Sequence, residues 1–131
     1  MKKLFTLCVA IFAILSIASC TKKDPTVKPQ NVRSILFKLY TQKDFSDNDE
    51  DITFSIFIKK ANQTLFDSTL ATMKIKDIPK SASAMIFEKK INDNSLLSAG
   101  FNYSIENVGT SSHIDTIAAG EQNKEIDFSF Q

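Results

Sequence analysis

The sequence is poor in the residues that cross-link small extracellular domains or bind metals in them. Its 131 residues include two cysteines, one histidine and no tryptophan. Cys8 and Cys20 both lie near the N-terminus, so the rest of the chain has no thiol for a disulfide. A single imidazole does not make a zinc or transition-metal site. The lack of tryptophan argues against a carbohydrate-binding face built on stacked indole rings.

The chain also lacks an excess of charge of either sign. It has 16 basic and 15 acidic residues and a net charge of +1. Without Lys2 and Lys3 the net charge becomes −1. This balance excludes a charge-driven interaction with nucleic acid or with an anionic membrane surface.

Long apolar runs are absent except at the N-terminus. Lys2 and Lys3 precede a charge-free apolar run over residues 4–17, and Ala18 and Ser19 follow it. A basic start, an apolar run and small residues form the three parts of a secretory signal peptide. The run is shorter than the roughly 20 residues that a membrane-spanning helix needs.

Residues 17–20, Ile-Ala-Ser-Cys, resemble the lipobox of bacterial lipoproteins. The resemblance implies cleavage of residues 1–19, a diacylglycerol thioether on Cys20, and acylation of the new N-terminus with a fatty acid such as palmitate. Two or more acyl chains anchor a protein stably in a membrane. The alternative is an ordinary signal peptide whose cleavage site happens to precede a cysteine.

Residues 20–33 predict a lipidated cysteine and a flexible tether. The segment is polar, holds two of the three prolines, and reaches at most about 40 Å when extended. Thr21, in place of an aspartate, favours transport to the outer membrane. The lysine and acid cluster at residues 22–24 resembles the surface-export signal of Bacteroidetes lipoproteins; the alternative is a solvated linker. We therefore expect a lipid-anchored protein of the cell outer membrane, facing the periplasm or exposed on the surface.

Residues 34–131 predict a single antiparallel β-sandwich, immunoglobulin-like or transthyretin-like, with about seven or eight strands. Apolar and polar residues alternate in short runs separated by turn signals, and no helical period is sustained. Nine of the eleven phenylalanines lie beyond the leader and supply core material. In its texture, rich in Lys, Asn, Ile and Phe and poor in Gly, the domain is similar to many small Bacteroidetes lipoproteins with one β-sandwich. The expected strands cover 34–40, 52–60, 64–68, 69–78, 83–90, 101–107, 112–117 and 125–131.

Three aspartates at alternate positions, Asp47, Asp49 and Asp51, suggest a calcium site. Alternating carboxylates in a loop offer several oxygen ligands to a hard cation. The loop lacks the central glycine and the downstream bidentate glutamate of known calcium loops. The alternative is a solvated loop that protects a hairpin end. No other cofactor is expected.

Two tripeptides, Asp67-Ser68-Thr69 and Asp115-Thr116-Ile117, resemble the O-glycosylation motif of Bacteroidetes envelope proteins. The resemblance implies glycans on Ser68 and Thr116, provided that both hydroxyls are exposed. The alternative is that both tripeptides are polar strand ends.

The chain shows no recognisable catalytic motif. His113 follows Ser111 and Ser112, but no G-x-S-x-G elbow is present, and we expect His113 to be a surface strand residue. The leading hypothesis is a non-catalytic binding or interaction module with a protein or glycan partner. The alternative is a structural accessory subunit of an outer-membrane complex.

A hydrolase-type enzyme is the weakest of the three hypotheses. It would require a pocket where carboxylates such as Glu88 and Glu106 converge. Two phenylalanines, Phe45 and Phe57, fall at positions that mark either an exposed contact patch or packing under a loop.

Overall fold

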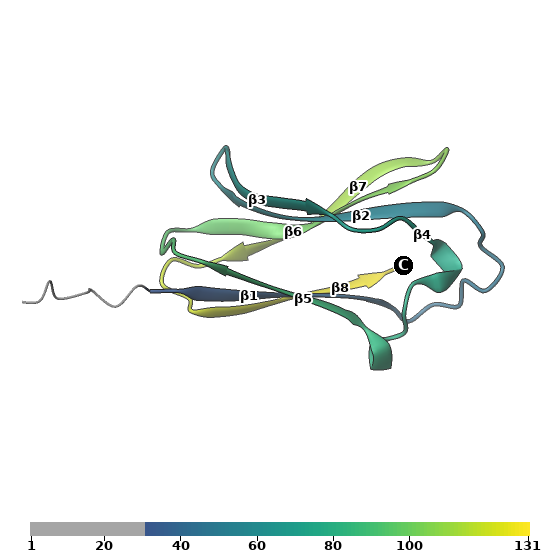
Figure 1. Cartoon of the computed structure of the whole chain (residues 1–131), viewed down its shortest axis with the longest axis horizontal. Helices are drawn as coiled ribbons and strands as arrows, with labels where there is room; N and C mark the ends of the chain where they lie inside the picture. The colour runs from purple at the N-terminus through teal and green to yellow at the C-terminus, as the bar shows by residue number, and fades with distance from the viewer. Residues whose placement is uncertain (1–30) are drawn as a thin grey trace, which may run out of the picture.

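The computed structural model describes residues 31–131, which fold into two β-sheets packed face to face (Figure 1). We call the three-stranded sheet sheet A and the five-stranded sheet sheet B. The predicted all-β sandwich is confirmed, with eight strands and no α-helix in the described part. Sheet A contains β1 (Arg33–Thr41), β5 (Met85–Ile91) and β8 (Asn123–Phe130); sheet B contains β2 (Asp51–Lys60), β3 (Gln63–Thr69), β4 (Met73–Lys74), β6 (Leu97–Ile105) and β7 (Gly109–Ile117).

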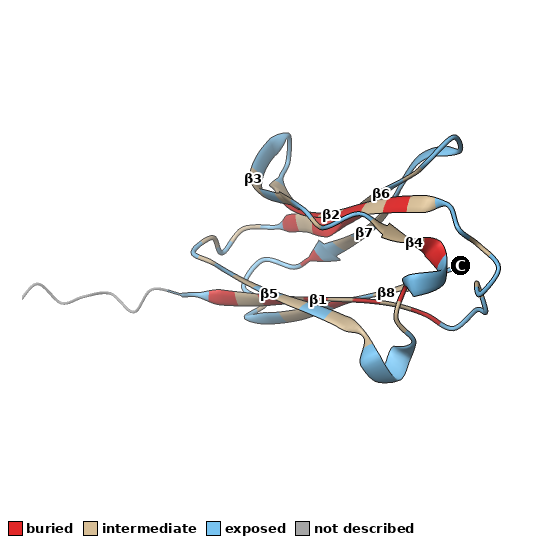
Figure 2. Ribbon diagram, turned by 45° about the vertical axis from the view of Figure 1, so that its right-hand side comes forward, coloured by how far each residue is buried: buried red, intermediate tan, exposed pale blue. Residues whose placement is uncertain are grey.

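The longest strands form where the sequence alternates most regularly. Every second residue of β1 is buried, beginning with Arg33 and Ile35, and β2 repeats the pattern from Ile52. Because alternate side chains of a strand point to opposite faces, each sheet turns one apolar face inward. Figure 2 shows the buried segments concentrated where the two layers face each other. Aromatic rings join the layers, as where Phe37 of sheet A meets Phe101 of sheet B edge to face, with 5.7 Å between ring centroids.

Sheet A contains one parallel pair, which the local pattern did not predict. β1 pairs antiparallel with β5 and parallel with β8, from Ser34 opposite Asn123 to Thr41 opposite Phe130. Parallel neighbours need a long crossover connection, and here nearly the whole domain lies between the two strands. The first and last strands therefore close the domain together.

Two segments differ from their expected structure. The expected strand over 69–78 is only the two-residue β4, followed by a 3₁₀ turn, η1 (Ile75–Asp77). This segment crosses from sheet B toward sheet A, and it buries Ile75 and Ile78 at a helical spacing. A second 3₁₀ turn, η2 (Ser81–Ser83), precedes β5. Conversely, β6 begins at Leu97, inside an expected loop, because Leu97 and Ala99 are both buried in the core.

Arg33, expected to end the tether, is instead the first residue of β1 and is fully buried. Its guanidinium donates four hydrogen bonds to backbone carbonyls, which come from Asp93, Ser95, Ala118 and Glu121, over 2.7–3.0 Å. A planar guanidinium with five N–H groups suits such a cluster of acceptors. The arginine thus ties the start of the domain to the loops before β6 and before β8.

The carboxylate of Asp93 reinforces this end of the sandwich. It accepts hydrogen bonds from the backbone N–H and the hydroxyl of Ser95, and it pairs with Lys60 at 3.0 Å. The two bonds from Ser95, followed by the bond from Lys60, lower the pKa of Asp93 to about 2. Within residues 31–131 no helix is long and apolar enough to span a membrane.

Candidate functional site

The outward face of sheet B is lined by hydroxyl and amide side chains. The registers of β2, β3, β6 and β7 place these side chains on one side of the sheet, since directly paired residues share a face. We call this surface the hydroxyl face. Its members are Thr53, Ser55, Thr69, Ser98, Asn102, Ser104, Thr110, Ser112 and Thr116, and two charged residues, Lys59 and Asp67, lie on the same side of the sheet.

The outward face of sheet A has a different chemistry, and we call it the charged face. Its members include Lys38, Glu88, Lys90, Glu125 and Asp127. Lys38 lies 3.7 Å from the carboxylate of Glu125 and 3.5 Å from that of Asp127, and Lys90 lies 3.7 Å from Glu88. The charged side chains of this face therefore neutralise one another.

The hydroxyl face is concave. The β2–β3 and β6–β7 hairpins rise away from sheet A at opposite ends of the sheet (Figure 1). Between them lies a shallow hollow of about 230 Å³, bordered by Thr53, Ser55, Asn102 and Thr110 among others. At its rim the hydroxyls of Thr53 and Thr72 are 2.7 Å apart, within hydrogen-bonding distance. A ligand in this hollow would meet donors and acceptors on several strands at once.

Gly100 interrupts the row of polar side chains on the hydroxyl face. A Cβ at this position would lie 1.9 Å from the carbonyl oxygen of His113, so only glycine fits beside β7 here. Phe57 and Ile114 pair with Gly100 from either side. Phe57 is 2% exposed and carries the Lys59 ammonium 5.0 Å from its ring centroid. It packs against the sheet and is not an exposed contact.

Phe45 also packs, in agreement with the second of the two expectations for it. Its ring lies 5.4 Å from that of Phe130, between centroids, and joins the edge of the core. The exposed large apolar side chain on the outer side of sheet B is instead Ile114, which is 57% exposed.

Two of the three aspartates of the expected calcium site form ion pairs with lysines. Asp49 lies 2.5 Å from the Lys76 ammonium, and Asp51 lies 2.7 Å from that of Lys74. The hydrogen bond and charge of Lys76 lower the pKa of Asp49, and the hydrogen bond to Asp51 raises the pKa of Lys74. The lysines of the β4–η1 segment thus neutralise two of the three carboxylates.

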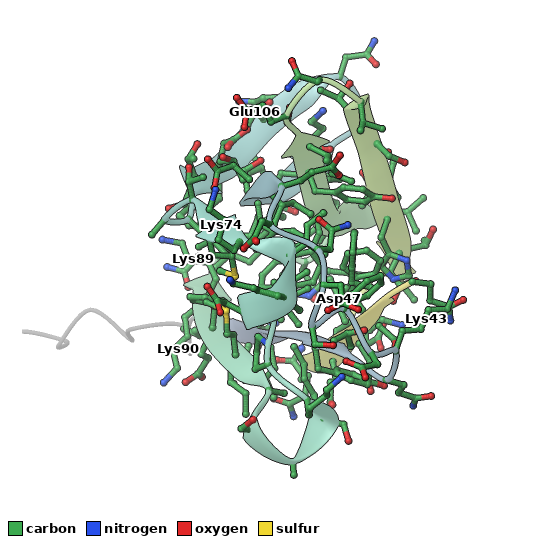
Figure 3. All side chains as sticks on the ribbon, turned by 90° about the vertical axis from the view of Figure 1, so that its right-hand side faces the viewer. Lys43, Asp47, Lys74, Lys89, Lys90 and Glu106 are labelled. Carbon is green, nitrogen blue, oxygen red and sulfur yellow. The ribbon has the colours of Figure 1, made fainter. Side chains whose placement is uncertain are left out.

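An open hollow of about 510 Å³ lies beside this loop, bordered by residues 47–50 and Glu106. Figure 3 looks onto this end of the sandwich, with Asp47, Lys74 and Glu106 labelled. Among residues 31–131 no group of three or more His, Cys, Asp or Glu side chains is arranged to hold a metal ion. Calcium binding by Asp47, Asp49 and Asp51 stays a prediction that this arrangement does not support.

His113 is not the surface residue that we expected. Its ring faces the inner side of β7 and stacks on Phe128, with 4.9 Å between centroids, and its buried Nε2 has no hydrogen-bond partner in the described part of the chain. Ser111 and Asp115 lie on the same side of the strand, two residues away in each direction. No hydrogen bond between these three side chains is found among residues 31–131, so they are not organised as a catalytic triad.

The two candidate carboxylates of the enzyme hypothesis do not converge. Glu88 lies on the charged face, where the hydroxyl of Ser34 donates to it over 2.7 Å. Glu106 follows β6 at the acidic end. The two residues border different hollows, on different sheets.

The two expected glycosylation sites differ in exposure. Thr116 is exposed on the hydroxyl face, whereas Ser68 is half-buried on the inner side of β3. Modification of either residue stays a prediction. The leader, Cys20 and the tether as far as residue 30 lie outside the described residues.

Comparison of this chain with protein-family models, with curated proteins and with solved structures found no match. The sequence carried a signal for the hydroxyl face, because serine and threonine occupy outward positions of several strands. Only the strand registers show that these positions join into one surface.

Proposed function

We propose that this chain is a lipid-anchored, non-catalytic binding module of the bacterial outer membrane. Cys20 carries the lipid, the polar segment up to residue 32 spaces the domain from the membrane, and the hydroxyl face contacts a protein or glycan partner. The leader with its lipobox-like end supports the anchor. The hydroxyl face supports the binding role.

The hydroxyl face carries the proposal because its polar groups suit recognition. Serine, threonine and asparagine side chains adapt their hydrogen bonding to a ligand, as they do in antibody paratopes. Burying neutral hydroxyls costs less free energy than burying charges. The charged face would have to break its ion pairs to bind in the same way.

The test compares matched substitutions on the two faces of the full-length, membrane-bound chain. Thr110→Lys with Ser104→Lys places two charges on exposed positions of the hydroxyl face. Asn123→Lys with Ile86→Lys is the control, which places two charges on exposed positions of the outward side of sheet A. We expect the hydroxyl-face variant to lose a partner that the wild-type chain and the control retain after detergent extraction. Equal partner recovery from all three chains would contradict the proposed face.

A structural subunit would give a different result in the same experiment. Fixed partners would then co-purify in constant ratio with all three chains. The anchor is tested separately by Cys20→Ser, which we expect to abolish lipid labelling and release the protein from the membrane. A Cys20→Ser variant that is still labelled with lipid and bound to the membrane would contradict the anchor. It would not affect the test of the hydroxyl face by the lysine variants.

A further inference from the structure

The free edges of the two sheets are not equally protected. Edge strands expose unpaired N–H and C=O groups, and proteins shield them with lysines, prolines, bulges or inward-pointing charges. β5 carries Lys89 and Lys90, β8 carries Lys124, and β3 meets β2 across a register shift at Ile58/Lys59. β7 has no lysine, arginine or proline over its nine residues, and its register with β6 is regular throughout. In the described sandwich it is the edge strand without lysine, proline or bulge, and its one charged side chain, Asp115, points inward.

The backbone of β7 offers hydrogen-bonding groups at this edge. The carbonyl oxygen of His113 points toward β6, since it lies where a Cβ of Gly100 would be. Because N–H and C=O groups alternate sides along a strand, those of Ser112, Ile114 and Thr116 point to the free edge. The described part of sheet B ends at β7.

The middle of β7 departs from hydrophobic alternation, although Ile117 at its end is buried in the core. Ile114 is 57% exposed on the outer face, while His113 turns inward with an unpartnered Nε2. Asp115 also faces inward, half-buried, and forms no ion pair with another residue in the range 31–131. An exposed isoleucine beside an unsatisfied imidazole and an unpaired carboxylate breaks the local rules of a stable strand, as functional sites commonly do.

We propose that β7 pairs antiparallel with β7 of a second copy of this chain, about a two-fold axis through Ile114. The two Ile114 side chains then cover each other on the outer face. On the inner face His113 lies opposite Asp115 of the partner subunit, and the same pair repeats across the axis. The Nε2 atom is covered in the single chain, so the imidazole turns about its Cβ–Cγ bond to reach the carboxylate.

The side chains that are brought together favour this register over an axis through His113. Two-fold pairing requires that residue i oppose j and j oppose i. An axis through His113 would instead oppose two imidazoles and leave Ile114 opposite a serine. An axis through Ile114 also sets Ser112 opposite Thr116 of the partner subunit, two hydroxyl residues side by side. The two hydroxyl faces then form one continuous surface, but the pairing holds whether or not that surface binds a ligand.

Cysteine cross-linking of the full-length chain in its membrane tests the pairing. Ile114→Cys places a thiol beside the two-fold axis. Ile86→Cys is the matched control, because Ile86 is 59% exposed on the edge strand β5. The wild-type chain measures any background from Cys8 and Cys20. With a short bis-thiol reagent we expect a covalent homodimer several-fold more abundant for Ile114→Cys than for either reference chain.

Co-expressed Ser112→Cys and Thr116→Cys chains test the register. We expect a heterodimer in excess of the two homodimers, since these positions face each other across the axis. Random pairing among the three products would overturn the register. No enrichment for Ile114→Cys over Ile86→Cys, or cross-links only to another protein, would overturn the dimer.

Sedimentation in detergent gives a second measurement that does not use cysteine. Ile114→Lys opposes two ammonium groups at the axis, and we expect it to raise the dimer dissociation constant on the order of tenfold or more. Ile86→Lys should leave the constant unchanged, and thermal melting checks that both variants fold. A monomeric wild-type chain, or equal constants for the two variants, would overturn the proposal.

Discussion

The two sheets share one apolar interior, but they use their outer faces differently. Sheet A presents Lys38, Lys90 and their carboxylate partners to the solvent, whereas sheet B presents mostly neutral hydroxyl and amide side chains, with Lys59 and Asp67 as the charged exceptions. Sheet A also contains the first strand of the described domain, β1, which begins at Arg33, and the last strand, β8. Arg33 joins this sheet to the loops before β6 and before β8, whereas the proposed function assigns binding to the hydroxyl face of sheet B.

Replacement of Arg33 by alanine should have the largest effect on stability, because it removes the four hydrogen bonds that join β1 to the loops before β6 and before β8. The change leaves four carbonyls without their donor at a buried site, and we expect a loss of about 4 kcal/mol in the free energy of unfolding. Arg33→Lys keeps the charge but not the planar fork, and should lose less. Urea denaturation measures both. An alanine variant as stable as the wild-type chain would contradict the role of Arg33.

Gly100→Ala should break sheet B at the point where β6 and β7 approach most closely. The added methyl group meets the carbonyl oxygen of His113 at 1.9 Å, and we expect a loss of about 3 kcal/mol from overpacking. Ser98→Ala, at the neighbouring outward position of β6, is the control and should change stability little. The same denaturation series separates the two variants, and equal stabilities would show that β7 has room to move.

The pairing of Asp93 makes stability depend on pH at low pH. Its pKa of about 2 lies below the usual value of 3.8, chiefly because Ser95 donates to it. A carboxyl group with a lowered folded-state pKa stabilises the fold above its unfolded pKa, and that contribution is lost as the pH falls through the folded value. Asp93→Asn should therefore lower the melting temperature at pH 7.

The difference in melting temperature between Asp93→Asn and the wild-type chain should shrink between about pH 4 and pH 2. Melting curves across this range measure it. A difference that does not vary with pH would mean that the carboxylate charge is not what stabilises this end.

Lys38→Ala should have the smallest effect, since it removes only exposed ion pairs of the charged face. Such pairs contribute little, and we expect a change below about 0.5 kcal/mol. The measurement is again urea denaturation. Exposed ion pairs rarely contribute more than about 1 kcal/mol. A loss of unfolding free energy above about 1 kcal/mol would therefore mean that the ion pairs of the charged face act together as a stabilising network.

The parts of the fold that the sequence predicts are those in which local pattern and burial agree. β1 and β2 were predicted within one residue at each end, because their alternation is regular. The expected strand over 69–78 was wrong, because its apolar residues serve a crossover between the sheets. The parallel pairing of β1 with β8 was not predicted, because strand partners are not written in any local pattern.

In the candidate site, too, strand alternation predicts some features, whereas strand register and burial determine the others. The outward hydroxyls of Thr53 and Ser55 follow from the alternation of β2, but which side chains of β6 and β7 lie beside them depends on the strand register. Arg33 was assigned to the tether because a polar residue beside prolines gives no sign of burial. His113 is expected on the surface because the sequence does not show which strand β7 pairs with. In the structure Ile114 lies outward, opposite Gly100, and alternation then places His113 on the inner side.

Thiol labelling in the native envelope tests the central claim most directly. Single cysteines at Ser104, on the hydroxyl face, and at Asn123, on the outward side of sheet A, are labelled with a membrane-impermeant maleimide in broken envelopes and again after purification. If the hydroxyl face binds a partner, the cysteine of Ser104→Cys is protected from the maleimide in the envelope and reacts with it after purification. The cysteine of Asn123→Cys reacts equally in both states. Equal reactivity of Ser104→Cys in the two states would contradict a binding role for the hydroxyl face.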